Sequence, residues 1–303
     1  MSTISVVIPS AGGADLWRAL ESVEAQTSPV DEKIIVLNNI DLTEAGELSA
    51  RLRQSGCTPV IAETGGACEA RDLGVEHATT DYIAFLDADD VWRPEKIERS
   101  LEELSTGKQL VSSRVQYFNE ASGDPVAVAP VEPYQAGTSL GQWLFVNRRL
   151  SPKRNVLHTS SLVISTVLAK KLRWVFGDPH EDWSFLLQAE QQAGTKDFAQ
   201  LGEVLVDVSM GSGRSLSAGI GWESSFAWLN QHRSFLNDHA YADFLAGQVM
   251  RYVLTSPGSA GSSKVISEVA RNWRTVSLRA VALGASGLVG RQRFEKIVAS
   301  ARS

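Results

Sequence analysis

Three carboxylates follow one apolar run in the stretch DYIAFLDADDVW. Asp87, Asp89 and Asp90 come directly after the apolar residues 82–86, which have the character of a buried strand. Carboxylates this close repel one another, and burying them is costly unless a positive charge compensates. Asp87 and Asp89 are two positions apart and can point the same way. They would then offer the hard oxygen ligands that Mg²⁺ or Mn²⁺ takes beside substrate phosphates. Alternatively, Asp89 or Asp90 caps a helix that begins near Trp92.

Short apolar strands and amphipathic helices alternate before this cluster and must position it. The predicted strands are residues 4–10, 32–39, 57–63 and 81–86, and the predicted helices are 14–27, 42–56 and 66–78. This alternation is typical of a doubly wound, mostly parallel α/β sheet, in which ligands bind beyond the carboxyl ends of the strands. The carboxylates lie at such an end. Further along, residues 156–165 are predicted as a strand.

Three stretches, in a fixed order, resemble the inverting family 2 glycosyltransferases of the GT-A fold. They are ISVVIPSAG at the N-terminus, GACEARDLGVEHATTDYIAFLDADDVWRPEKI in the middle and HEDWSFLLQA further on. The resemblance covers roughly residues 3 to 217. It implies a Rossmann-like, mostly parallel sheet flanked by helices. The region after about Trp222 lies outside the resemblance, and its residue pattern predicts a helical C-terminal extension. The resemblance also implies a nucleotide-diphospho-sugar donor and an acceptor hydroxyl.

The resemblance gives the carboxylates separate roles. Asp89, together with Asp87, would bind a divalent cation, Mn²⁺ or Mg²⁺, that bridges the diphosphate of the donor. Asp182 would be the general base that removes the proton of the acceptor hydroxyl, and Glu181 would orient the acceptor. Without the upstream motifs, Glu181 and Asp182 would be two acids favoured by the dipole of a helix N-terminus. Asp90 would either support the metal site or cap the next helix.

The donor would be held by residues at the strand ends and in a later loop. The candidates are Pro9, Ser10, Ala11, Asn38, Asn39, Asp41, Arg71, Asp87, Ala88 and Arg214. Two features depart from the family pattern: Asp72 stands where Asn is common, and two Asn residues stand where an acid often contacts the base. The nucleotide is therefore left open.

The charge of the chain is uneven. From residue 251 onward there are nine Lys and Arg but two acids, whereas the whole chain has a net charge of −6. We predict a catalytic domain over residues 1–221, with a nucleotide-sugar half (about 1–105) and an acceptor half (about 106–221). A helical region with a basic tail follows over 222–303. The tail could lie on an anionic membrane surface, or it could pack on a partner or a second copy of the chain.

Composition and sequence signals limit the possible partners and location of the protein. The chain is acidic and carries no recognised nucleic-acid module, so nucleic-acid binding fits poorly. The two cysteines lack the spacing of metal ligands. We read neither a signal peptide nor a transmembrane run in the sequence. These features predict a cytoplasmic protein that is at most peripheral at the inner face of the plasma membrane. The predicted acceptor is a glycan or a lipid-linked glycan, in surface polysaccharide synthesis. The competing hypotheses are a nucleotidyltransferase and an inactive sugar-nucleotide-binding or scaffold protein.

Overall fold

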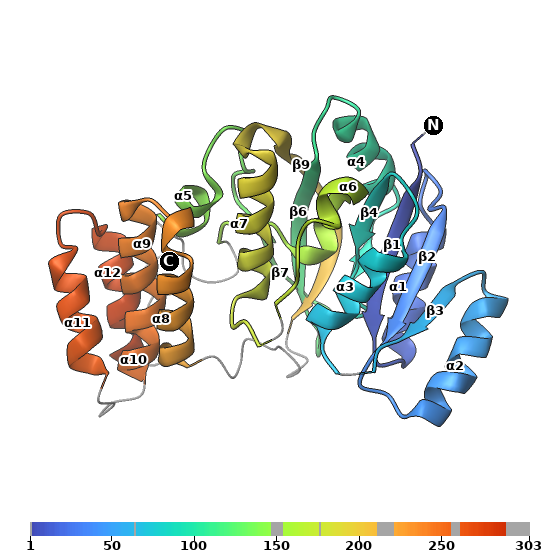
Figure 1. Cartoon of the computed structure of the whole chain (residues 1–303), viewed down its shortest axis with the longest axis horizontal. Helices are drawn as coiled ribbons and strands as arrows, with labels where there is room; N and C mark the ends of the chain where they lie inside the picture. Colours follow the sequence, from blue (N-terminus) through green and yellow to red (C-terminus); the bar gives the residue numbers. More distant parts are fainter. Residues whose placement is uncertain are drawn as a thin grey trace. The chain divides into compact units, whose positions relative to one another are not determined.

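The computed structural model describes residues 2–63, 65–146, 154–175, 177–210, 221–255 and 261–288. The chain divides into two compact units (Figure 1). The first comprises Met1–Thr138 and Val156–Gly213, and the second comprises Ser139–Asn155 and Arg214–Ser303. The boundary expected near residue 221 stays a prediction, and the second unit also takes in the helix α5 (Leu140–Phe145).

The first unit is built on one mixed sheet. Its strands are β1 (Ile4–Ser10), β2 (Glu32–Leu37), β3 (Thr58–Ile61), β4 (Tyr82–Phe85), β5 (Val91–Trp92), β6 (Leu110–Asn119), β7 (Pro125–Ala129), β8 (Val163–Ser165) and β9 (Phe198–Met210). They are ordered β3-β2-β1-β4-β8-β6-β9-β5, and β7 pairs with β6. The strands β3, β2, β1 and β4 are mutually parallel, whereas β8 runs antiparallel to both β4 and β6. The parallel half matches the predicted α/β pattern.

Helices cover both faces of the parallel half. They are α1 (Ala14–Glu24), α2 (Leu42–Gln54) and α3 (Ala67–His77). Side chains alternate between the faces along a strand, and β1 follows this rule. Val6 and Ile8 belong to the core cluster that contains residues of α1 and α2. Val7 instead points at Gly74 of α3, where an added Cβ would lie 2.3 Å from Val7 Cγ1. Only glycine therefore allows α3 to approach β1 this closely.

Two predicted elements differ from the structure. Residues 156–165 were expected to form a strand, but they contain a short 3-10 helix, Thr159–Ser161, before the three-residue β8. The helix expected near Trp92 begins later: β5 comes first, and α4 spans Lys96–Leu104 with Glu95 at its N-cap position. Asp89 and Asp90 therefore do not cap α4, and the capping alternative is wrong.

The second unit is helical, as the sequence predicts from Trp222 onward. Its other helices are α8 (Trp222–Gln231), α9 (Asp238–Phe244), α10 (Arg251–Thr255), α11 (Ser262–Arg271) and α12 (Leu278–Ala285), with a π-helical stretch (Leu245–Met250) between α9 and α10. Aromatic rings of α5, α8 and α9 meet in its interior: the Phe145 ring lies edge-on to both Trp228 and Phe244. Within the described residues, we find no helix with the length and apolar character to cross a bilayer.

Candidate active site

Arg71 joins the carboxylate cluster to the first turn of α7 (Glu181–Ala193). Its Nη2 donates to Asp87 Oδ1 at 2.7 Å, and its Nη1 donates to Glu181 Oε1 at 3.0 Å. Asp87 stands two residues beyond the end of β4, and Arg71 extends from α3, so the close packing of α3 on the sheet delivers the guanidinium to the strand end. The structure thus brings together three predicted residues: Arg71, Asp87 and Glu181.

The Arg71 guanidinium is buried against aromatic rings. Its central carbon lies 4.6 Å from the centre of the Trp174 ring, and Trp174 in turn stacks on Phe185 at 4.2 Å. Burial alone would lower the pKa of Arg71, but attraction from Asp87, Asp182 and Glu181 outweighs it and raises the pKa. Arg71 is therefore a permanent positive charge, stabilised on one side by an indole face and on the other by carboxylates.

The clustered aspartates differ in their electrostatics. Burial pushes the pKa of Asp87 upward, but Arg71 and His158 reverse this, so its pKa is lowered and the carboxylate stays ionised. The pKa of Asp89 is raised, by burial and by repulsion from Asp87. The pKa of Asp90 is raised well above its ordinary value, by burial and by repulsion from Asp87 and Asp89. Asp89 and Asp90 are thus carboxylates whose negative charge lacks full compensation within the protein.

Asp90 is held on the inner side of the cluster. Ser160 Oγ donates to Asp90 Oδ2, and the backbone N–H of Ser209 donates to Oδ1 at 3.1 Å. His158 Nδ1 lies 3.8 Å from the same carboxylate. Only 2% of Asp90 is exposed, so it supports the cluster from within.

Asp182 and Glu181, the predicted catalytic pair, have distinct surroundings. Asp182 is exposed, and its Oδ1 accepts a hydrogen bond from Thr159 Oγ1 at 2.6 Å. Glu181 is partly buried: besides Arg71, it accepts a hydrogen bond from Cys68 Sγ at 2.7 Å. Burial, opposed by Arg71, raises the pKa of Glu181, and burial and the bond to Glu181 raise the pKa of the Cys68 thiol. Asp182 is therefore the carboxylate that a substrate can reach.

Sequence reasoning missed the connector His158–Ser160. The hydroxyl of Thr159 reaches Asp182, while Ser160 Oγ donates to Asp90 and also accepts from the Asp87 backbone N–H at 3.1 Å. Trp92 Nε1 fixes the connector by donating to Ser160 O at 2.7 Å. The available signal was a run of four polar residues, HTSS, which interrupts the apolar pattern of a strand. The connector links the predicted base to the aspartate cluster.

The remaining predicted donor residues lie around the ends of β1 and β2. Ser10 Oγ accepts from Gly12 N at 2.9 Å, and its carbonyl accepts from Asn38 N at 3.0 Å. Asn39 has a positive φ of 54°, and Asp41 caps α2 by accepting from Thr43 N. Pro9 is the last residue but one of β1, and Ala88 lies between Asp87 and Asp89. Arg214 lies outside the described residues. Donor contacts for all of these stay predictions.

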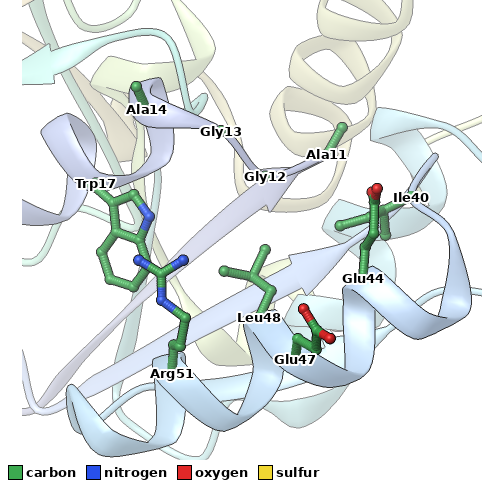
Figure 2. A pocket seen from close by; sticks show the side chains of 10 residues that line it. All are labelled: Ala11, Gly12, Gly13, Ala14, Trp17, Ile40, Glu44, Glu47, Leu48 and Arg51. Carbon is green, nitrogen blue, oxygen red and sulfur yellow. The ribbon is translucent and has the colours of Figure 1, made fainter.

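A cavity of about 420 Å³ opens between α1 and α2, beside the end of β1 (Figure 2). Of the predicted donor residues that the structure describes, Ala11 alone lines it. The rest of the lining consists of Gly12, Gly13, Ala14, Trp17, Ile40, Glu44, Glu47, Leu48 and Arg51. The Arg51 guanidinium covers the Trp17 ring at 4.9 Å from its centre. The aspartate cluster does not line this cavity.

Asp87 and Asp89 have the carboxylate oxygens that a divalent cation prefers as ligands. Among the described residues, no three His, Cys, Asp or Glu side chains form a set that could hold a metal alone. Mg²⁺ and Mn²⁺ often need only one or two protein carboxylates when substrate phosphates supply the rest. Asp89, with its raised pKa, and Asp87 fit that arrangement, because a cation would offset the uncompensated charge.

The sequence and the fold were then compared with known proteins. A family model described as glycosyl transferase family 2 matches residues 5–152. The amylovoran biosynthesis glycosyltransferase AmsB of Erwinia amylovora is 26% identical over 203 residues, which is 62% of this chain and 64% of that protein. The succinoglycan biosynthesis protein ExoW of Rhizobium meliloti is 32% identical over 190 residues, 57% of this chain and 58% of that protein.

The solved structures add the fold. The S. aureus TarS 1–349 structure in complex with UDP-GlcNAc superposes with a TM-score of 0.67 at 17% identity, over 93% of this chain and 83% of that chain. The chain spans 64%, 33% and 46% of three of the curated relatives that it matches, thus less than two thirds of each. The predicted α/β fold of GT-A type is confirmed. The chain thus has a GT-A-type fold, and its residues 5–152 are similar to glycosyl transferase family 2.

Proposed function

We propose that the protein is an inverting glycosyltransferase that moves a sugar from a nucleotide-diphospho-sugar to an acceptor hydroxyl. The observation that carries the proposal is the connector His158–Ser160. Through it, the exposed carboxylate of Asp182 is tied to the same short segment that holds Asp90 and the backbone of Asp87. A candidate base and a candidate phosphate-metal site are thus built as one unit, as a single displacement between donor and acceptor requires.

In the proposed reaction, Asp182 removes the proton of the acceptor hydroxyl. The acceptor oxygen forms a bond to the anomeric carbon of the donor sugar, while the bond between that carbon and the diphosphate oxygen breaks. The electron pair leaves with the nucleoside diphosphate, and the configuration at the anomeric carbon inverts. Thr159 orients the carboxylate of Asp182 for this step, because its hydroxyl occupies one lone pair of Oδ1. A divalent cation at Asp89 and Asp87 would stabilise the charge on the leaving diphosphate.

The donor and the product class are proposed from the relatives. TarS was solved with UDP-GlcNAc, which makes UDP-sugars the first donors to test. The names of AmsB, ExoW and TuaG of Bacillus subtilis refer to the biosynthesis of amylovoran, succinoglycan and teichuronic acid. We therefore propose a role in bacterial polysaccharide synthesis, with a glycan or lipid-linked glycan as acceptor.

Thermal-shift titration with UDP and UDP-sugars, with and without Mn²⁺, tests the donor site. We expect a metal-dependent rise in Tm that Asp89→Asn abolishes and that Asp124→Asn, in an exposed turn, leaves intact. Asp182→Asn should keep the Tm shift but abolish transfer, measured as release of nucleoside diphosphate. Loss of donor binding in Asp182→Asn would contradict the role of a base. The absence of any shift with nucleoside diphosphates and metal would contradict the donor site.

A further inference from the structure

The turn between α11 and α12, in the second unit, presents large apolar side chains to solvent. Trp273 is 67% exposed and Leu278 is 89% exposed, and Ile266 of α11 is 47% exposed. Single exposed leucines are common on protein surfaces, but here a Trp and a Leu flank one four-residue segment. We call residues 271–279 the α11–α12 turn. Trp273 and Leu278 are exposed and do not belong to the buried core of this unit.

The backbone of this turn is firmly fixed. Ser277 donates from its backbone N–H to Asp243 Oδ1 and from its hydroxyl to Asp243 Oδ2, both at 2.7 Å. Ser277 Oγ also accepts from Ala280 N and so caps α12. The Thr275 carbonyl lies 2.8 Å from His239 Nδ1. Asp243 is 2% exposed, so the turn is anchored to the interior of the unit, and Leu278 is held outward at the first position of α12.

The charge of the turn is opposite to that of the whole chain. Residues 269–288 contain Arg271, Arg274 and Arg279 and no acid, whereas the chain carries a net charge of −6. Arg274 lies over the Trp273 ring, 5.1 Å from its centre. Arg271 pairs with Glu268 of α11 at 2.7 Å. Arg274 therefore lies against the exposed Trp, while Arg271 and Arg279 stand at the two ends of the turn.

We propose that the α11–α12 turn docks on the surface of an anionic lipid bilayer. Trp prefers the headgroup level of a bilayer, Leu gains from entering the acyl boundary, and each nearby Arg is attracted to anionic headgroups. A rigid turn inserts these side chains without first having to order its backbone, which lowers the entropic cost of binding. The proposal concerns the second unit alone and does not depend on the proposed transferase activity.

Co-sedimentation of the full chain with vesicles tests the proposal. The vesicles are phosphatidylcholine alone and phosphatidylcholine with about one third phosphatidylglycerol. We expect binding to the anionic vesicles that weakens as salt rises. The double variant Trp273→Ser/Leu278→Ser should bind these vesicles at least about tenfold more weakly than the wild type, because most of the inserted apolar surface is gone. Arg274→Gln/Arg279→Gln should weaken binding to the anionic vesicles in particular.

A matched control is available in the first unit. Leu42 is 75% exposed and occupies the first position of α2, directly after its N-cap Asp41, just as Leu278 follows Ser277. Leu42→Ser should bind vesicles like the wild type. Equal binding of the Trp273→Ser/Leu278→Ser variant, or no binding of the wild type to anionic vesicles, overturns the proposal. The proposal is also overturned if, in the absence of lipid, the wild type is a dimer and the Trp273→Ser/Leu278→Ser variant is a monomer. Circular dichroism and Tm show that each variant is folded.

Discussion

Arg71 and Asp87 form a nearly buried ion pair in which the same guanidinium also binds Glu181. The side chain of Arg71 is 5% exposed, and the Nη2 to Oδ1 distance is 2.7 Å. The Nη1 to Glu181 Oε1 distance is 3.0 Å. The Arg71 guanidinium thus offsets two acids, one that follows β4 and one at the start of α7. It ties both of these elements to α3.

Replacing Arg71 by Met should therefore destabilise the first unit. Met keeps an unbranched apolar side chain but leaves Asp87 and Glu181 without their cation. Removing one partner of a buried pair typically costs about 3–5 kcal/mol in the free energy of unfolding. Urea unfolding of both proteins measures the difference. As a control, Arg173→Met removes an exposed ion pair with Glu76, 3.6 Å apart, and should cost at most about 1 kcal/mol. Equal costs for the two variants would argue against a bridging role for Arg71.

Thr159→Val should lower kcat and leave the donor KM nearly unchanged. The substitution keeps the shape of the side chain but removes the hydrogen bond to Asp182. A hydrogen bond to a charged group contributes roughly 1.5–3 kcal/mol, so kcat should fall about 10- to 100-fold. Thr159→Ser restores the hydroxyl and should recover most of kcat.

The same substitution at Thr166 is the control for Thr159→Val. Thr166 is buried too, and within the described part of the chain its Oγ1 has no hydrogen-bond partner. Thr166→Val should therefore leave kcat unchanged. A fall in kcat for Thr166→Val, or none for Thr159→Val, would speak against positioning through the hydroxyl.

Gly74→Ala should destabilise the protein, although alanine favours helices. The new Cβ would lie 2.3 Å from Val7 Cγ1, and valine in a strand cannot rotate away easily. Overpacking of this kind costs about 1–3 kcal/mol, against roughly 1 kcal/mol gained in helix propensity. Gly46→Ala in α2 meets no atom within 4 Å and should be stabilising by up to about 1 kcal/mol. Thermal unfolding of both variants gives the comparison, and Val7→Ala should partly rescue Gly74→Ala.

Lys96 should make stability depend on pH. Its side chain is fully buried at the start of α4 near the Trp92 ring, and its Nζ has no hydrogen-bond partner within the described residues. Burial lowers the pKa of Lys96 to about 7 in the folded protein, against about 10.4 in the unfolded chain. Between these values the unfolded chain binds a proton that the folded protein lacks. The free energy of unfolding should therefore rise with pH over this window, by up to about 1.4 kcal/mol per unit.

Urea unfolding between pH 6 and pH 10 measures this dependence. Lys96→Met should remove the rise and be more stable than the wild type at pH 6, where burying the charged ammonium is costly. The exposed Lys171, changed to Met, should keep the rise. An unchanged pH dependence in Lys96→Met would mean that Lys96 does not titrate in this window.

The parallel half of the fold could be predicted from the sequence because its signals are local. Each of β1, β2 and β4 is a continuous apolar run, and buried parallel strands have this character. The short β5 escaped prediction, and the strand predicted over residues 156–165 is confirmed only in its last three residues, β8. β5 has two residues and β8 has three, which is too few for a period to show. Their pairing, β5 with β9 and β8 with β4 and β6, is set by distant parts of the chain.

The site was predictable where a motif marks it. Asp87, Glu181 and Arg71 stand in recognisable stretches, and the structure brings them into contact. Of the two roles left open for Asp90, the helix cap is wrong because the chain forms β5 before α4, so that Asp90 turns inward to Ser160 and Ser209. The hydrogen bond between Thr159 and Asp182 could not be predicted from the sequence. A short polar run shows no helical or strand periodicity, and the two residues are 23 positions apart.

The late position of the connector has a consequence for biosynthesis. Asp87 is only 16 residues from Arg71 and has its partner available as soon as β4 is made. Asp90 must await Ser160, 70 residues later, and Ser209, 119 residues later. At about 5–20 residues per second, the first delay is roughly 4 to 14 s. A nascent chain that stops before Ser160 therefore carries an Asp90 without its hydroxyl donor, and during synthesis the Arg71–Asp87 ion pair can form before the contacts of Asp90.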